Sequence, residues 1–196
     1  MSFNQTQALE VVAMVHELTG MRDPYTVAHE RRVAEIACLV ASDMGLDDDT
    51  ITGLSVACHL HDVGKIMVPV EILNKPGKIS EWELGFIRQH SQSGYNILRH
   101  IPLPWPIATI ALQHHERLDG SGYPHHLKES ELLLESRILS VVDTFEAMAS
   151  NRPYRFGLGV DRAMDELIYG AGVRYDSRAV YALKRLVDQG VVLIND

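Results

Sequence analysis

The sequence predicts an all-α fold in a single domain, and three observations lead to that fold class. Apolar residues recur with helical spacing along nearly the whole chain. No stretch keeps the alternation of apolar and polar residues that half-buried strands show. The chain has 196 residues, 46% of them hydrophobic, which suits one domain of about 100 to 200 residues with its own core. We therefore expect a bundle of about seven to eight helices.

Capping residues and glycine or proline breaks predict where these helices begin and end. Asp23 and Pro24 start the second helix and Gly45 ends it, while Ser80 and Glu83 form a capping box for the fourth. Residues 1–22 are expected to pack as an N-terminal helix on one globular unit, residues 23–196. The predicted helices cover residues 4–21, 24–44, 47–61, 80–100, 107–116, 134–149, 160–169 and 177–189, the last with Asp176 as its N-cap.

The charge balance excludes several classes of partner. Against 18 Lys and Arg residues stand 26 Asp and Glu residues, a formal net charge of -8, so no global positive field attracts a nucleic-acid polymer or an anionic membrane. Apolar runs fall far short of the roughly 18 residues that span a bilayer, and no signal-peptide pattern opens the chain. We expect a soluble cytoplasmic protein whose Cys38 and Cys58 are buried free thiols.

Ten histidines, several at inward positions, raise the question of a metal. Each of these inward side chains lies on the apolar stripe of its own helix. His59, in contrast, points to a different side of the helix from His61. A lone inward histidine is more often a core imidazole bonded to a carbonyl, but several buried imidazoles and a carboxylate need a shared partner. Ligands of this type suit Fe, Mn, Zn or Ni rather than a thiolate zinc site. The inward residues are His29, His61, His90, His114 and Asp143.

Five motifs together resemble the HD-GYP subfamily of the HD superfamily of metal-dependent phosphohydrolases. The resemblance covers about residues 23–186 and implies a helical fold around a bimetal or trimetal centre. It also implies a bacterial phosphodiesterase that hydrolyses cyclic di-GMP or another cyclic dinucleotide. The motifs are Asp23-Pro-Tyr-Thr-x-x-His29, His59-Leu-His-Asp-Val-Gly-Lys65-Ile, Lys75-Pro-Gly-Lys78, His114-His-Glu-Arg-x-Asp-Gly-Ser-Gly-Tyr-Pro124 and Arg152-Pro-Tyr-Arg155.

The resemblance also implies a set of metal ligands, with Asp62 as the carboxylate that bridges two ions. Where the trimetal subgroup has a Glu, four residues before the first ligand histidine, this chain has Tyr25. A phenol is a poor ligand at neutral pH, so we expect two divalent ions, Fe or Mn first and Zn or Ni as alternatives. The implied ligands are His29, His61, Asp62, His90, His114, His115 and Asp143.

The implied reaction is attack of a metal-activated hydroxide on the phosphodiester, giving pGpG, GMP or both. Asp62 and Lys65 are the catalytic candidates, because a lysine about one turn after the bridging carboxylate can place its ammonium on a phosphate oxygen. Several other cationic or aromatic side chains are candidates for substrate binding, although the charged ones are equally well explained as solvated surface residues. The substrate-binding candidates are Lys65, Lys75, Lys78, Arg117, Tyr123, Arg152 and Arg155.

The loop from Asp119 to Pro124 keeps two interpretations. Tyr123 offers a face for a base or a protein partner, and in the family this loop is implicated in contacts with diguanylate cyclase domains. A structural turn that orients His114 and His115 explains the loop equally well. This sequence departs from the family pattern at two places flanking the loop. Leu118 stands where the family often has Trp, and His125-His126 stand where a basic residue and Gly are common. Neither departure changes the implied ligands.

Two other functions stay open at this point. A catalytically weak cyclic-dinucleotide receptor or adaptor would keep the fold and signal through its surface, and retention of every ligand position argues against it. An HD-type nucleotidase acting on other phosphate esters is disfavoured by the Gly-Tyr-Pro loop.

Overall fold

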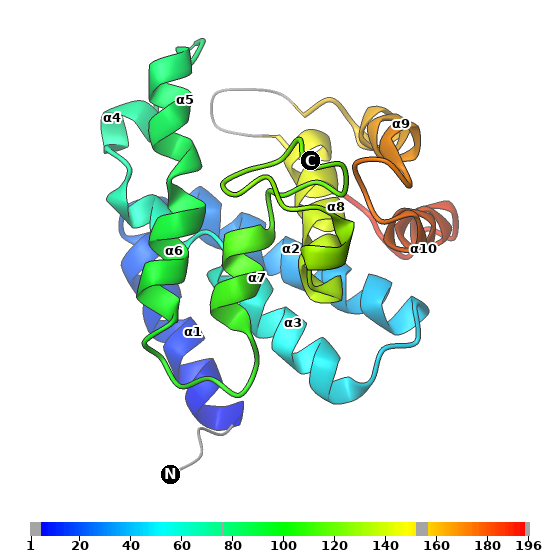
Figure 1. Ribbon diagram of the computed structural model, residues 1–196, viewed down its shortest axis with the longest axis horizontal. Helices are drawn as coiled ribbons and strands as arrows, with labels where there is room; N and C mark the ends of the chain where they lie inside the picture. The colour runs from blue at the N-terminus through cyan, green and yellow to red at the C-terminus, as the bar shows by residue number, and fades with distance from the viewer. Residues whose placement is uncertain (1–4, 76, 152–156, 195–196) are drawn as a thin grey trace.

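The described residues, 5–75, 77–151 and 157–194 of the computed structural model, form α-helices and short 3-10 turns with no strand (Figure 1). This confirms the predicted all-α class. The elements are α1 (Gln5–Gly20), α2 (Pro24–Asp43), α3 (Asp48–Leu60), η1 (Val63–Met67), α4 (Val70–Leu73), α5 (Glu81–Arg88), α6 (His90–Leu98), α7 (Ile107–Gln113), η2 (Glu129–Glu131), α8 (Leu134–Ala149), α9 (Val160–Gly170) and α10 (Ser177–Asp188).

Helices α2, α3 and α8 form the centre of the domain. Helix α2 packs against α1, α3, α8 and α10, while α9 and α10 lie together on one side of α8 (Figure 1). The core between them is built from apolar stripes, with Leu54 of α3 and Phe145 of α8 among its fully buried side chains. Helix α1 is joined to this core by His16, whose Nε2 lies 3.2 Å from Glu30 Oε2. The ligand-bearing helices are therefore held by one continuous core.

The predicted helix caps are present. Asp23 accepts hydrogen bonds from the backbone N–H of Tyr25 and Thr26, and Ser80 and Glu83 bond reciprocally at the start of α5. Asp176 caps α10 through the N–H of Arg178. Each such cap contributes about 1 kcal/mol. Gly45, at φ 79°, turns the chain out of α2 as expected.

The helix predicted for residues 80–100 is wrong as one element, because the chain forms α5 and α6 with a break at Gln89. At this break the start of α6 packs directly on η1, because a Cβ atom added to Gly64 would lie 2.0 Å from the His90 carbonyl oxygen. His90 is the first residue of α6.

Cys38 and Cys58 are both free thiols, as expected. Cys58 is buried as expected, whereas Cys38 is half-buried rather than buried. Among the described residues, no helix combines the length and the apolar character needed to cross a membrane.

Candidate metal centre

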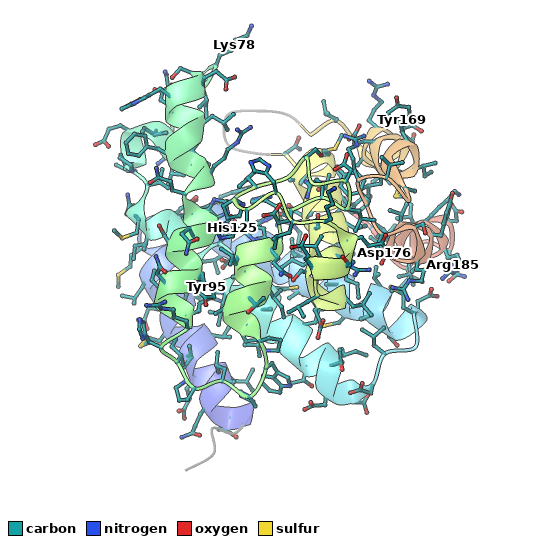
Figure 2. The ribbon with its side chains drawn as sticks, in the orientation of Figure 1. Lys78, Tyr95, His125, Tyr169, Asp176 and Arg185 are labelled. Atoms are coloured by element: carbon teal, nitrogen blue, oxygen red, sulfur yellow. The ribbon has the colours of Figure 1, made fainter. Side chains whose placement is uncertain are left out.

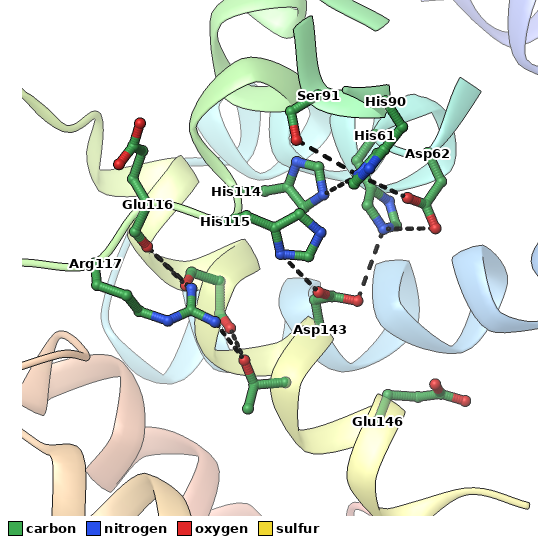
Figure 3. A network of polar contacts seen from close by, with 12 residues as sticks. His61, Asp62, His90, Ser91, His114, His115, Glu116, Arg117, Asp143 and Glu146 are labelled. Atoms are coloured by element: carbon green, nitrogen blue, oxygen red, sulfur yellow. Dashed lines mark hydrogen bonds and ion pairs between the residues drawn. The ribbon is translucent and has the colours of Figure 1, made fainter. Parts of the chain in front are cut away.

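The predicted ligands come together in one cluster at the junction of five elements. Figure 3 shows all of them except His29. His29 comes from the second turn of α2, and His61 with Asp62 from the end of α3. His90 begins α6, His114 and His115 follow α7, and Asp143 lies in α8. All are buried except His115, whose side chain is 20% exposed.

The candidate ligand atoms form three overlapping groups within which every pair lies within 4.8 Å. One group is His29, His61 and Asp143; another is His90, His114 and His115; the third is His61, Asp62 and His114. Asp62 reaches towards both sides, because its Oδ1 lies 3.4 Å from His90 Nε2 and its Oδ2 3.5 Å from His61 Nε2. Asp143 Oδ1 lies 3.0 Å from His29 Nε2. Asp62 thus lies between the imidazoles of His61 and His90.

The donor set fits divalent cations. His61 Nε2 is buried without a hydrogen-bond partner among the described residues, which is costly unless a cation accepts its lone pair. Its Nδ1 lies 2.7 Å from the Cys58 carbonyl oxygen, so Nδ1 carries the proton and Nε2 is left as the ligand atom. Imidazole and carboxylate donors without thiolate suit Fe, Mn, Zn or Ni.

The ionisation states suit ligation as well. Burial lowers the pKa of His90, and lowers those of His114 and His115 well below the ordinary value, so these imidazoles are neutral near pH 7. Burial alone would raise the pKa of Asp62, but the Lys65 ammonium and the nearby imidazoles hold it well below its usual range. Neutral imidazoles and ionised carboxylates are the forms that bind metal.

His29 differs, because two carboxylates contact its ring. Burial lowers the pKa of His29, yet hydrogen bonds with Asp143 and Glu146 outweigh it and raise the pKa to about 9. Asp143 faces Nε2 and Glu146 contacts Nδ1. Carboxylates that stabilise a proton on His29 equally stabilise a cation at Nε2.

Sequence reasoning missed Glu146. Its side chain is fully buried, and besides His29 it accepts hydrogen bonds from Arg32 Nε at 2.6 Å and Ser150 Oγ at 2.8 Å. The available signal was its spacing, since Glu146 lies one turn after Asp143 on the same inward stripe of α8.

Lys65 lies beside the cluster. Its Nζ donates to Asp62 Oδ2, and both side chains line a pocket shared with Thr19, Arg22 and Thr26. The Arg22 guanidinium does not face a ligand but donates to the backbone carbonyl groups of Ile66 and Val68. A phosphate entering this pocket would meet the Lys65 ammonium next to the ligands.

The Gly-Tyr-Pro loop closes the cluster on the side of His115. Tyr123 N–H donates to the His115 carbonyl at 3.2 Å, and the two rings form a tilted pair with centroids 4.7 Å apart. Glu116, which sequence reasoning also missed, is buried and accepts from the N–H groups of His125 at 2.6 Å and Leu127 at 3.1 Å. These contacts hold the loop against His115 and Glu116.

Three of the remaining cationic candidates, Lys75, Lys78 and Arg117, lie outside the cluster. Lys75 pairs with Glu83 at 2.7 Å, and Lys78 is exposed at the far tip of the α4–α5 hairpin (Figure 2). Arg117 points away from the histidines (Figure 3); it donates to Ser140 Oγ and lies over the ring of Tyr175. Arg152 and Arg155 lie outside the described residues. Arg88, which no sequence signal marked, lies over the Tyr123 ring, 5.4 Å from its centroid.

A family model described as an HD domain matches residues 13–179 of this chain. The chain belongs to the HD domain family. Its ordered motifs, from the His-Asp pair to the Gly-Tyr-Pro loop, place this HD domain in the HD-GYP subfamily, which confirms the resemblance.

Curated relatives of this HD domain are cyclic-dinucleotide phosphodiesterases by name. The cyclic di-GMP phosphodiesterase response regulator RpfG of Xanthomonas campestris is 41% identical over 181 residues, which are 90% of this chain and 47% of that protein. A cyclic di-GMP phosphodiesterase of Thermotoga maritima is 38% identical over 90% of this chain and 49% of its own. A 3'3'-cGAMP-specific phosphodiesterase of Vibrio cholerae is 33% identical over 91% of this chain and 39% of its own. The chain thus spans about half the length of the relatives it matches, or less.

Solved structures agree with the fold. Bd1817, an HDG"Y"P protein from Bdellovibrio bacteriovorus, gives a TM-score of 0.72 at 16% identity, over 94% of this chain and 62% of that chain. The HD domain of the L. monocytogenes phosphodiesterase PgpH, solved with cyclic-di-AMP, gives 0.69 at 19% identity, over 93% of this chain and 98% of that chain. At these identities the likeness supports the HD fold alone.

Proposed function

We propose that this HD domain is a metal-dependent phosphodiesterase that hydrolyses cyclic di-GMP or a closely related cyclic dinucleotide. The observation that carries the proposal is the convergence of the seven candidate ligand side chains on one cluster, in which Asp62 lies between His61 and His90. The names of the relatives supply the substrate class, and two of them name cyclic di-GMP. Because cyclic dinucleotides of this type are intracellular messengers, we also place the domain in the cytoplasm.

Two groups of residues would each hold one divalent ion. His29, His61 and Asp143 would hold one divalent ion, and His90, His114 and His115 the other, with Asp62 shared. Bound ions of this kind activate water and neutralise charge on a phosphate. Fe or Mn suits this donor set first, and Zn or Ni are alternatives.

Lys65 and the Tyr123 loop would orient the substrate. The Lys65 ammonium, held by Asp62, can donate to a phosphate oxygen that enters the pocket. Tyr123 presents an aromatic ring beside His115, where a nucleobase can stack. Burial raises the pKa of Tyr123 above its ordinary value, so its phenol stays a neutral hydrogen-bond donor.

The test is metal analysis and product chromatography on protein purified without oxygen. Cyclic di-GMP, 3'3'-cGAMP and cyclic di-AMP are each incubated with the metal-loaded protein, and linear dinucleotide and mononucleotide are quantified. We expect about two ions per chain and conversion of cyclic di-GMP to pGpG, GMP or both. Fully loaded protein that binds a cyclic dinucleotide without cleaving it would support the receptor function instead. Absence of both binding and cleavage would refute the proposal.

A further inference from the structure

Three ligand histidines are oriented by backbone carbonyl groups. The Nδ1 atoms of His61, His90 and His114 lie 2.6 to 2.7 Å from the carbonyl oxygen three residues earlier. His61 caps the end of α3 and His114 the end of α7, and His90 directly follows the last turn of α5. Carbonyl groups in the last turn of a helix have no partner within it. A neutral acceptor therefore fixes each of these rings.

His29 cannot be oriented in this way, because it lies inside α2 rather than at its end. The carbonyl groups of the preceding turn are engaged in the hydrogen bonds of the helix. Its Nδ1 is bonded instead to the carboxylate of Glu146, which reaches over from α8. Arg32 and Ser150 hold the other oxygen of that carboxylate at 2.6 and 2.8 Å. The ring of His29 therefore has an ionised, immobilised acceptor.

The group that accepts the Nδ1 proton of a histidine affects how strongly its Nε2 binds a metal ion. A carboxylate that accepts the Nδ1 proton makes Nε2 a stronger donor than a carbonyl group does. His29 belongs to the group that also contains the carboxylate of Asp143, whereas the group of His90, His114 and His115 consists of imidazoles alone. Asp62 faces both groups. Asp143 also faces the second group, because its Oδ2 lies 3.9 Å from His115 Nδ1. Glu146 is thus the carboxylate that distinguishes the side of His29.

We propose that Glu146 makes the two metal positions unequal: the ion held by His29, His61 and Asp143 binds first and tightly, and the ion held by His90, His114 and His115 exchanges. Glu146 acts as a positioning residue, through His29. The inference rests on the proposed dinuclear function and adds an order of loading to it. The affinity for the exchangeable ion then determines the metal concentration at which both positions are filled.

The first experiment titrates the metal-free full chain with Zn²⁺ by calorimetry and follows the histidine ring signals by NMR. The wild-type protein should bind in two steps that differ about tenfold or more in affinity. The first equivalent of diamagnetic Zn²⁺ should shift the ring signals of His29 before those of His90. Two equal steps, or an earlier shift of the His90 signals, would overturn the inference without the use of any variant.

The second experiment removes only the charge of Glu146. Glu146→Gln keeps an oxygen that can accept from His29 and should weaken the tight step by about 10- to 100-fold, with the weak step nearly unchanged. Glu146→Asp keeps the charge and should retain more of the tight step than the Gln variant does. Glu135→Gln, in the first turn of the same helix, is the matched control. An unchanged tight step in a folded Glu146→Gln protein contradicts the assignment.

These outcomes separate the inference from the proposed function. Protein that takes up fewer than two ions refutes the dinuclear function itself. Protein that binds two ions with equal affinity and still cleaves cyclic di-GMP refutes only the inequality.

Discussion

The rings of His115 and Tyr123 form a tilted aromatic pair, with centroids 4.7 Å apart and 30° between the ring planes. One belongs to the metal cluster and the other to the Gly-Tyr-Pro loop, so the two motifs form one structural unit. Backbone contacts reinforce the pair, because Tyr123 N–H donates to the His115 carbonyl. Any displacement of the loop must therefore also move a face of the metal centre.

The Glu116→Ala variant tests how the loop is held. The substitution leaves the N–H groups of His125 and Leu127 without their buried acceptor, which costs about 1–3 kcal/mol. We expect a lower free energy of unfolding by that amount and faster amide hydrogen exchange at residues 120–127. Glu135→Ala in α8 serves as control. Unchanged exchange in the loop of the Glu116 variant would show that other contacts hold it.

Gly64→Ala tests the close approach between η1 and α6. The added Cβ would lie 2.0 Å from the His90 carbonyl oxygen and 2.5 Å from Gly94 N, and backbone atoms cannot move aside as a flexible side chain can. We expect a loss of about 1–3 kcal/mol in the free energy of unfolding, with weaker metal binding because His90 shifts. Chemical denaturation and metal content measure both effects.

Gly85→Ala is the matched control for Gly64. Gly85 lies in α5, and an added Cβ meets nothing within 4 Å. Alanine should therefore stabilise the protein by up to about 1 kcal/mol. Equal effects at the two glycines would contradict the proposed contact between Gly64 and His90.

The fold and the inward positions of five candidate ligands could be predicted from the sequence, whereas Asp62 and His115 came from the family resemblance. Helical periodicity placed His29, His61, His90, His114 and Asp143 on inward stripes, and inward stripes of packed helices face a common core. Local capping signals likewise predicted the starts of α2, α5 and α10. These features depend on residues within one or two turns of each other, which sequence reasoning can see.

The features that were missed depend on contacts between distant segments. The contact of Glu146 with His29 joins residues 117 positions apart, and the break at Gln89 reflects packing of α6 on η1. Arg88 has no local signal at all and is identified only by its place over Tyr123. Lys75 and Arg117 looked like substrate ligands because of motif position and charge, whereas the structure pairs them with protein groups.

Lys75 and Glu83 allow a test by pH. Hydrogen bonds from Lys75 and Ser80 lower the pKa of Glu83 from an ordinary 4.5 to about 2. Because the folded pKa lies below the unfolded one, the ionised carboxylate stabilises the protein above about pH 4.5, and this contribution is lost as the pH falls towards 2. Carboxyl carbon NMR should find the Glu83 midpoint near 2, and Lys75→Met should raise it. A Glu83 midpoint near 4.5 in the wild-type protein would rule out the pairing in solution.

Asp62→Ala tests the bridging carboxylate. Asp62 is buried between the two ligand groups, and a carboxylate there balances cationic charge that neutral imidazoles cannot. We expect loss of at least one ion per chain and of essentially all cyclic di-GMP hydrolysis, with the helical circular dichroism signal retained. The control is Asp161→Ala, an exposed acidic residue in the first turn of α9. Full metal content with retained turnover would refute the bridging role.

Tyr25 determines the expected number of ions. Its ring lies parallel to that of His29, 6.4 Å between centroids and 10° between planes, one helical turn before the first ligand. A phenol is a much poorer ligand than a carboxylate at neutral pH, so Tyr25 does not provide the charged donor that a third cation needs. We expect two ions per chain in the wild-type protein and in Tyr25→Phe, counted by elemental analysis after removal of free metal. Tyr25→Glu introduces a carboxylate one turn from His29 and should recruit a third ion. A wild-type crystal with three fully occupied ions would show that other groups provide the charged ligand that Tyr25 lacks. A Tyr25→Glu protein that still binds two ions would show that charge at this position does not set the number of ions.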